Sequence, residues 1–445
     1  MLQLPLIALL IAVFTAVPVL VPRLAKALEI RRVVSPGGIE AWLVQDDAVP
    51  IISINFAFKG GAALDPEGKE GLADMVSGLL DEGAGELDSG AYQAALKDIS
   101  ASISFDAGQD RFRGSMRTLS RNRDAAFQLL RLAVTAPRFE KEPVERIRSQ
   151  LIAGLLSELE NPRRIAGRTW YKTVFPDHPY GRPVGGVVKT VKGLTVADLR
   201  GFVARRFARA GLVIGVVGDI TGVELGRRLD EVFGALPVNP SSVDLPEAAI
   251  SGQGRVIVVR KPIPQSIVIF GHKGVKRDDP DYYTAYVLNH VLGGGGFSSR
   301  LTEEIREKRG LVYSVYSYLN PMDHGALIMG GLGSQNARVA ESLAIVRSEW
   351  SRIAEQGVAL DELASAKTYL NGSFPLRLDS SSRIARMLVA IQAHKLGIDY
   401  LDRRPELING VTGDDVRRVA RRLFDARKLT VVVVGNPKGL ENSPD

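Results

Sequence analysis

The chain has 445 residues, of which 45% are hydrophobic and 24% charged, a composition typical of soluble globular proteins with two or more domains. This composition excludes a fibrous, collagen-like or largely disordered chain. Because there is no cysteine, disulfides, thiolate nucleophiles and cysteine-based zinc sites are excluded as well. The net charge of +7 is spread over small basic clusters without interleaved aromatic residues, which predicts solvated helix faces and no nucleic-acid site.

Residues 1–27 have the pattern of a targeting segment. An apolar run at 6–17 ends at Pro18, and Ala25-Lys26-Ala27 is a small-x-small cleavage site. No Lys or Arg precedes the apolar run, so the alternative to cleavage is an anchor retained over residues 2–22. Either outcome predicts a periplasmic or secreted body, which contacts a membrane only if the segment is retained.

The first half of the remaining chain begins with apolar alternating residues at 51–58, which predict a strand. An Asp-Pro turn leads into a predicted helix at 71–80, followed by a strand at 102–105 and then long helices. A β-branched strand at 212–217 closes this half.

The second half repeats this order, with strands predicted at 265–270, 327–331 and 429–434 and a helix at 282–292. Gly193 and Gly218 recur as Gly410 and Gly435, each 217 residues later. Near the start of the halves, Lys59-Gly60 and Asp65-Pro66 recur 214 residues later as Lys273-Gly274 and Asp279-Pro280. Two matching blocks separated by a short indel indicate a diverged tandem duplication.

Strands and helices that follow one another in runs, without strict βαβ alternation, predict an α+β fold. We expect two homologous domains, each a mainly antiparallel sheet with helices packed on one face, over residues 28–236 and 255–445. The Pro/Ser-rich stretch 237–254 is the predicted linker. Two such domains would form a clamshell with a cleft between them.

Residues 293–317 contain the strongest candidate for a chemical site. A glycine run precedes a charged helix, and Tyr313 follows Arg306 by seven residues. An arginine and a phenol at one point can hold a carbonyl oxygen that becomes negative. The alternative is structural: Arg306 pairs with Glu303 on the helix surface, Gly310 ends the helix, and Tyr313 is an ordinary strand residue.

The glycine run itself does not fit a phosphate-binding loop, because it lacks the GK[ST] ending and a preceding strand of a βαβ unit. We expect Gly293, Gly294, Gly295, Gly296 and Phe297 to form a loop where a substrate backbone comes close. A plain helix-ending turn is the alternative.

Several motifs resemble the pitrilysin/insulinase family of zinc peptidases, most closely its short two-domain branch related to mitochondrial processing peptidase. His178-Pro179-Tyr180-Gly181, followed by Gly185 and Gly193-Leu194-Thr195, looks like that family's "HPYG…G…LT" block. Ser298-Ser299-Arg300-Leu301 through Tyr313-Ser314 looks like its second-half signature. The resemblance covers essentially the whole chain after residue 27 and implies that branch's clamshell fold.

The family's zinc motif is absent from the matching segment. The family binds zinc through an HxxEH helix and a distal glutamate. Aligned with that pattern, Asp74 and Gly78 stand at the histidine positions, Ser77 at the glutamate position and Gly154 at the distal position. The five histidines of the chain are too far apart in sequence to share a helical turn. We therefore expect no intrinsic metal.

The Arg306/Tyr313 pair of the family is intact. In the short branch the zinc half and the Arg/Tyr half can lie on different polypeptides, so the resemblance implies a heterodimer whose zinc-bearing homologous partner supplies the metal. The pair would then grip the scissile carbonyl of a peptide or unfolded protein. The alternative is a non-catalytic peptide-binding or scaffold protein of the same fold. In the family the edge strand of the first domain pairs extended peptides, so we expect the half that contains Lys59-Gly60-Gly61 to bind peptide without cutting it.

Overall fold

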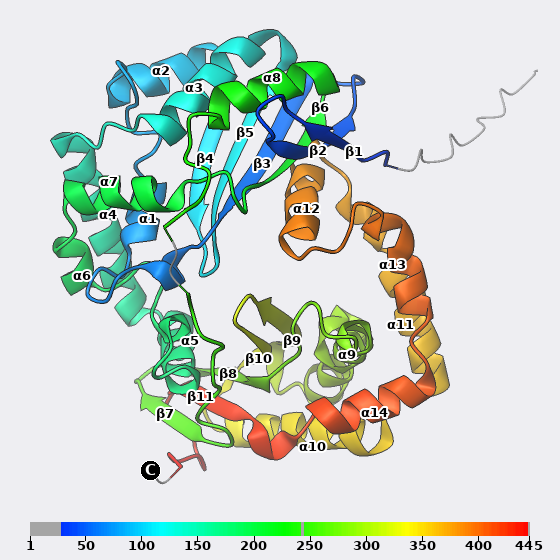
Figure 1. The fold of residues 1–445 in the computed structure, drawn as a ribbon. Coiled ribbons are helices and arrows are strands. Elements are labelled where there is room, and N and C mark those ends of the chain that lie inside the picture. The colour runs from blue at the N-terminus through cyan, green and yellow to red at the C-terminus, as the bar shows by residue number, and fades with distance from the viewer. Residues whose placement is uncertain (1–27, 242–243, 444–445) are drawn as a thin grey trace, which may run out of the picture.

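Two β-sheets, one from each half of the chain, organise the protein (Figure 1). The computed structural model describes residues 28–241 and 244–443, so the predicted targeting segment lies outside the described residues. In the part of the chain that is described, no helix combines the length and apolarity needed to cross a bilayer. The predicted linker, 237–254, contains neither helix nor strand in its described residues.

The first sheet has the order β1-β2-β6-β3-β5-β4, and the second has the order β7-β11-β8-β10-β9. One pair in each sheet is parallel, β2–β6 and β7–β11, and the other neighbouring pairs are antiparallel. The strands of the first sheet are β1 (Arg31–Val34), β2 (Glu40–Gln45), β3 (Ile51–Lys59), β4 (Ser102–Ala107), β5 (Arg111–Leu119) and β6 (Val213–Gly218). Those of the second sheet are β7 (Val256–Arg260), β8 (Gln265–Lys273), β9 (Val312–Met322), β10 (Gly325–Gln335) and β11 (Thr430–Gly435).

The helices follow the same duplicated order. Those of the first half are α1 (Leu72–Ser77), α2 (Ser89–Asp98), α3 (Arg123–Thr135), α4 (Lys141–Glu160), α5 (Pro162–Val174), α6 (Val188–Lys192), α7 (Val196–Arg206) and α8 (Gly222–Phe233). Those of the second half are α9 (Tyr282–Asn289), α10 (Val339–Gln356), α11 (Leu360–Gly372), α12 (Ser381–Ala393), α13 (Tyr400–Asn409) and α14 (Gly413–Leu423). The predicted helix 282–292 is divided, because α9 continues as a π-helical turn, η4 (His290–Gly294).

The repeated Gly-x-Thr motif has a structural explanation. Thr195 accepts a hydrogen bond from the backbone N–H of Asp198, whose carboxylate accepts the backbone N–H of Thr195 in return. Thr412 and Asp415 make the same reciprocal pair at the start of α14. These are capping boxes, which satisfy backbone donors that a helix leaves free in its first turn. The sequence repeat therefore marks two equivalent helix starts, α7 and α14.

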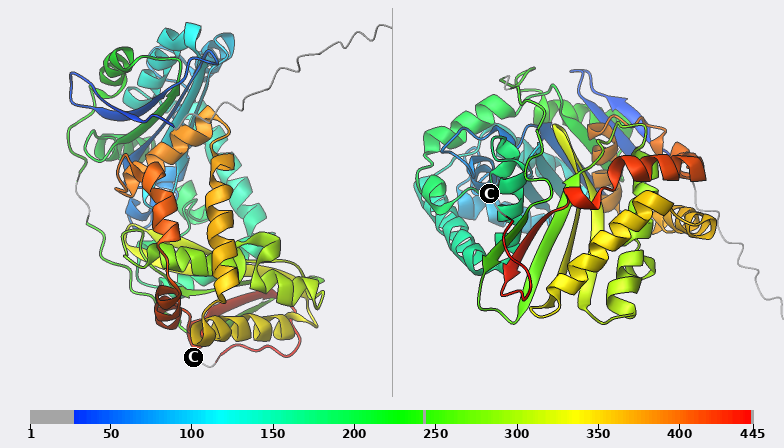
Figure 2. Two further views of the ribbon diagram at one scale, coloured as in Figure 1. Left: turned by 90° about the vertical axis from the view of Figure 1, so that its right-hand side faces the viewer. Right: turned by 90° about the horizontal axis from the view of Figure 1, so that it is seen from below.

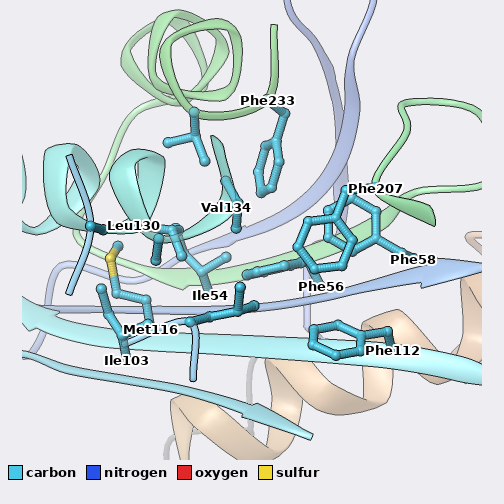
Figure 3. Close-up of a cluster of buried hydrophobic side chains, with 14 of the residues drawn as sticks. Ile54, Phe56, Phe58, Ile103, Phe112, Met116, Leu130, Val134, Phe207 and Phe233 are labelled. Atoms are coloured by element: carbon cyan, nitrogen blue, oxygen red, sulfur yellow. The ribbon is translucent and has the colours of Figure 1, made fainter. Parts of the chain in front are cut away.

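The core of the first half lies between its sheet and the helices α1, α3, α7 and α8. Phe58 stacks on Phe207 at 4.4 Å, and Phe56, Phe112 and Phe233 pack around them (Figure 3). Helices α10 and α14 cover the corresponding face of the second sheet (Figure 1, Figure 2). These two layers confirm the predicted α+β fold with helices packed on one face of each sheet.

The opposite face of each sheet receives a helix from the other half. Trp170 of α5 is buried against the second sheet and donates its indole N–H to the carbonyl oxygen of Thr430 at 3.0 Å. Gln392 of α12 donates to the carbonyl oxygen of Ile214 in the first sheet at 2.9 Å. Figure 1 shows α5 and α12 in the space between the two sheets. The two halves are thus joined by an exchange of equivalent helices.

Candidate functional site

Arg306 contacts two exposed aromatic rings. Its guanidinium carbon is 4.7 Å from the ring centroid of Phe297 and 5.7 Å from that of Tyr313. Tyr313 is 86% exposed and Phe297 74% exposed. Three elements supply these side chains: a 3₁₀ turn (Gly296–Ser298), a π-helical turn, η6 (Thr302–Glu307), and the start of β9. The fold therefore brings the predicted Arg306/Tyr313 pair together and adds Phe297 to it.

The carboxylates near Arg306 are mostly occupied by other cations. Glu304 pairs with Lys308 at 2.8 Å and with Arg309 at 2.7 Å, and these bonds lower its pKa. Arg306 makes a long contact of 3.6 Å from its Nε to the exposed Glu307, which contributes little in water. Cation–π contacts with the two rings instead orient the guanidinium. A positioned, solvent-facing guanidinium beside a phenol can hold an oxygen that gains negative charge.

The first three glycines of the run are packed closely against other atoms of the chain. A Cβ at Gly293 would lie 2.5 Å from Ser317 Oγ, one at Gly294 would lie 2.7 Å from Asn289 Nδ2, and one at Gly295 would lie 2.8 Å from a backbone oxygen. Asn289 and Ser317 also hydrogen-bond each other through buried groups. The first three glycines thus permit tight packing of η4 against β9.

Gly296 differs from the other three glycines. It has φ +60°, an exposed position and no atom within 4 Å of where a Cβ would be. It leads directly into the exposed Phe297. Of the five residues predicted to approach a substrate, Gly296 and Phe297 thus combine exposure with open space around Gly296, and substrate contact by all five stays a prediction.

The positions that correspond to the zinc ligands lie on two packed helices. Asp74 and Ser77 are on α1, Gly78 ends that helix, and Gly154 is in the middle of α4. A Cβ at Gly78 would lie 3.3 Å from the Ile147 side chain of α4, so the two helices are in contact.

The residues present there do not fit zinc. Ser77 donates its hydroxyl hydrogen to the carbonyl oxygen of Asp74 at 2.7 Å, and the two glycines have no donor atom. Burial raises the pKa of Asp74, and the nearby carboxylates of Asp106 and Glu158 raise it further. Over residues 28–241 and 244–443, no group of three or more His, Asp or Glu side chains is placed to hold a metal ion. A tetrahedral zinc site needs three or four such ligands.

A cavity of about 1160 Å³ lies between the two halves. Its walls come from β3–β5, the start of α5, the segment 180–185, the β9–β10 turn and α12. The position of Asp74 is directly behind this wall, since a Cβ on the lining residue Gly185 would lie 3.4 Å from its carboxylate. Among the described residues that line this cavity, Arg306, Tyr313 and the loop 293–297 are absent. The predicted catalytic pair therefore lies apart from this cavity.

A polar cluster at the edge of the cavity holds the two halves together. The Tyr180 hydroxyl donates to Asp110 at 2.5 Å and accepts the backbone N–H of His324 at 3.0 Å. Arg111 forms an ion pair with Asp323 at 3.0 Å. Burial and Asp110 both raise the pKa of Tyr180, so the phenol stays protonated.

This cluster explains the HPYG block, since the ring nitrogen Nδ1 of His178 accepts the backbone N–H of Tyr180 and holds that segment in place. Sequence reasoning missed the cluster. Asp110 and His324 are 214 residues apart, the same offset that relates Lys59 to Lys273, and this was the signal that could have pointed to it.

Strand β3, which ends at Lys59, is central in its sheet, between β6 and β5. The edge strands of the first sheet are β1 and β4, and Ser104, Phe105 and Asp106 of β4 line the cavity. Gly60 and Gly61 pack beside the β4–β5 turn, where a Cβ at Gly61 would lie 2.1 Å from a backbone oxygen. The strand expected to pair with peptides is thus β4, and the Lys59 segment supports the turn next to it.

Comparison with known proteins gives one family. Residues 193–370 match the model of the peptidase M16 inactive domain. An uncharacterized zinc protease of Streptomyces coelicolor, SCO5738, is 27% identical over 93% of this chain and 91% of its own length. The non-peptidase homolog YmxG of Helicobacter pylori is 26% identical over 88% of this chain and 91% of its own length.

Solved structures agree on the fold. A crystal structure described as a peptidase M16 inactive domain from Pseudomonas fluorescens is 27% identical, with a TM-score of 0.86, and covers 94% of this chain and 100% of its own. A protease from Helicobacter pylori matches with a TM-score of 0.82 at 19% identity, covering 91% of this chain and 99% of its own. A chain of complex III₂ from Candida albicans matches with a TM-score of 0.76 at 15% identity, covering 92% and 96%.

The match to an inactive domain and the relative named a non-peptidase homolog both support the predicted lack of independent peptidase activity. The resemblance seen in the sequence motifs is confirmed: residues 193–370 match the M16 inactive-domain model, and over most of its length the chain is similar to proteins named as zinc proteases or as a non-peptidase homolog.

Proposed function

We propose that this chain is the metal-free subunit of a heterodimeric M16 peptidase, and that a homologous partner chain carries the zinc ion. The observation that supports this most is the position of Arg306, in contact with the rings of the exposed residues Phe297 and Tyr313. The positions of the zinc ligands in the same chain have been replaced by residues that cannot hold a metal. One half of a hydrolytic site is therefore retained and the other half is lost.

In this proposal the pair acts on the substrate carbonyl. A zinc ion held by the partner chain would supply the chemistry that activates water for attack. Arg306 and the Tyr313 hydroxyl donate hydrogen bonds to the scissile carbonyl oxygen, or to the adjacent backbone, as negative charge develops there. Because the guanidinium is already oriented by two rings, little reorganisation is needed when the substrate arrives. Gly296 has no side chain and open space around it, so it leaves room for the substrate backbone beside Phe297.

The test is reconstitution with the zinc-bearing homologue. The purified chain alone hydrolyses no unfolded peptide, while the mixture gives cleavage that a chelator blocks. Arg306→Ala lowers kcat/KM of the mixture by about 10²–10³-fold, the usual loss for a donor to a developing oxyanion. Arg309→Ala is the matched control, because its guanidinium bonds Glu304 instead. Unchanged kcat/KM with Arg306→Ala would refute the catalytic role.

A non-catalytic peptide-binding or scaffold role is the second candidate. It is favoured by the relative named a non-peptidase homolog and by the likeness of fold to a chain of a respiratory complex. Purification of the tagged chain from its own host distinguishes the two proposed functions. Zinc and peptidase activity in the recovered complex support the heterodimeric enzyme, whereas stable partners without either support the scaffold. We also propose a periplasmic or secreted location, which N-terminal sequencing of the recovered chain tests.

A further inference from the structure

The cavity between the halves is predominantly basic. Seven arginines and four carboxylates line it, which leaves a formal excess of +3 when its histidine is neutral. Its volume of about 1160 Å³ exceeds the ~300–1000 Å³ of pockets that enclose small molecules. The space is therefore suited to a segment of polymer with a negative charge.

The carboxylates of the lining are already bound to other groups. Glu158 pairs with Arg168 at 2.7 Å, and Asp106 pairs with Arg113 at 3.4 Å. Asp323 is held by Arg111, and Asp110 accepts hydrogen bonds from the Tyr180 hydroxyl and from the backbone N–H of Asp323. These acids therefore do not counter the remaining arginines.

Two arginines of the lining have no such partner. Among the described residues, no ion pair joins Arg163 of α5 or Arg386 of α12 to a carboxylate. Both are exposed to the cavity, and they come from the two helices that the halves exchange. A ligand that contacts both would span the two halves.

The same cavity also offers polar groups to an extended chain. Ser104 of the edge strand β4 hydrogen-bonds Ser115 of β5 at 2.8 Å, and both line the cavity with Asn55 of β3. An edge strand presents unpaired backbone groups to an extended peptide, and serine and asparagine side chains can bond its amides.

We propose that this cavity binds acidic peptide segments in an extended conformation, with Arg163 and Arg386 as the residues that select negative charge. The inference rests on the proposed peptide-handling function and adds the class of substrate. Uncompensated cations on two walls favour Asp- or Glu-rich segments and disfavour Lys- or Arg-rich ones.

The test measures binding to the isolated full chain by fluorescence anisotropy. Three dye-labelled unstructured peptides of equal length are used, one Glu/Asp-rich, one Lys/Arg-rich and one uncharged. The acidic peptide binds tightest, and its Kd rises with salt because the contacts are between solvent-exposed charges. The double variant Arg163→Glu/Arg386→Glu raises that Kd by about tenfold and narrows the preference over the basic peptide.

Arg383→Glu is the matched control. It makes the same charge change on the same helix, but Arg383 pairs with Asp379 and is outside the cavity lining. Equal affinity for all three peptides, or an equal loss with Arg383→Glu, overturns the proposal. Displacement of the acidic peptide by inorganic phosphate at matching concentration would assign a small-anion site and overturn it too.

The cavity proposal and the catalytic proposal fail separately. Arg306→Ala leaves acidic-peptide binding to the isolated chain unchanged, because Arg306 does not line the cavity. If Arg306→Ala abolishes this binding, the peptide lies on the Arg306 surface and the cavity assignment is wrong. Hydrolysis by the mixture with the partner is a different readout and decides the catalytic role alone.

Discussion

The indole N–H of Trp170 and the carbonyl oxygen of Thr430 are 3.0 Å apart, although they belong to different halves of the chain. Trp170 is fully buried against the second sheet, among residues such as Met329 and Val432. An equivalent contact runs the other way, from Gln392 to the first sheet. Each half therefore stabilises the sheet of the other, so the two are expected to unfold together.

Substitution of Trp170 tests this dependence. Trp170→Phe loses the hydrogen bond and is expected to cost about 1 kcal/mol, while Trp170→Ala leaves a cavity and costs about 3–5 kcal/mol. Guanidinium unfolding followed by circular dichroism measures both. Because α5 joins the halves, the whole transition moves to lower denaturant. A first transition that leaves half of the signal native would contradict the coupling.

His272 predicts how stability depends on pH. Its Nε2 accepts the indole N–H of Trp350 at 2.8 Å, so its proton is on Nδ1, which is 2.7 Å from the carbonyl oxygen of Lys273. Burial lowers the pKa of His272 to about 4, whereas in the unfolded chain it is ~6.5. The contribution of neutral His272 to the free energy of unfolding is fully present above pH ~6.5. It is lost as the pH falls toward 4, and the loss is up to about 3 kcal/mol.

The measurement is the free energy of unfolding in urea at several pH values between 7.5 and 4.5. His272→Gln keeps an acceptor for Trp350 but cannot titrate, so its stability should fall less on acidification than that of the native chain. The difference between the two curves isolates His272 from the other histidines. Parallel curves would show that His272 does not contribute.

The sheet architecture could be predicted because duplication leaves the same residues at the same offsets. Gly193 and Gly410 precede equivalent helix starts, and Gly218 and Gly435 end equivalent strands, β6 and β11. The exchange of α5 and α12 could not be predicted in this way. Hydrophobic periodicity shows that one face of α5 is buried, but it does not say which sheet covers that face.

The proximity of Arg306 and Tyr313 could also be predicted from a sequence pattern. A family pattern placed Arg306 and Tyr313 seven residues apart, and a short connection is enough to bring them together. The packing role of Gly293 could not be predicted from the sequence. A side chain there would meet Ser317, which lies on a different element, β9. The cavity arginines were missed because Arg163 and Arg386 are far apart in sequence. They line the same cavity because α5 and α12 are exchanged between the halves.

The phenol of Tyr313 is predicted to matter through its hydroxyl group. In the reconstituted mixture, Tyr313→Phe should lower kcat by about 10²-fold, because the ring contact with Arg306 remains but one donor to the oxyanion is lost. Tyr316→Phe is the control, since its ring stacks on Tyr318 and it is outside the predicted pair. Equal kcat values for both variants would remove Tyr313 from the mechanism.

We predict that substitutions at Gly293 and Gly296 have different effects, because Gly293 is packed against other atoms and Gly296 lies at the surface. Gly293→Ala forces a Cβ to within 2.5 Å of Ser317 Oγ and 2.8 Å of its backbone nitrogen, which should cost about 1–3 kcal/mol of unfolding free energy. Gly296→Ala meets no neighbouring atom and costs about 1 kcal/mol through its positive φ.

Substrate affinity should follow the opposite order. Gly296→Ala alters the surface beside Phe297 and is expected to raise KM in the mixture, while Gly293→Ala affects stability alone. Urea unfolding and steady-state kinetics on the same two variants check both statements. A larger KM effect for Gly293→Ala would restore that residue to the substrate-binding set.

The loss of zinc is predicted to be reversible by substitution. Restoring the family pattern requires Asp74→His, Ser77→Glu, Gly78→His and Gly154→Glu, on helices that are already in contact. A Cβ at Gly154 would meet nothing within 4 Å, and one at Gly78 would lie 3.3 Å from a methyl carbon of Ile147. Three of the new side chains can act as ligands and the fourth as a base, as a catalytic zinc site needs.

Metal analysis after dialysis measures the result. The native chain should retain no stoichiometric zinc, and the fourfold variant should retain about one ion per chain, because three ligands are the minimum for such a site. The same variant without Gly154→Glu lacks the third ligand and should lose its zinc on dialysis. One tightly held zinc in the native chain, removable by a chelator, would show that Asp74 and its neighbours bind metal after all and that no partner is needed to supply it.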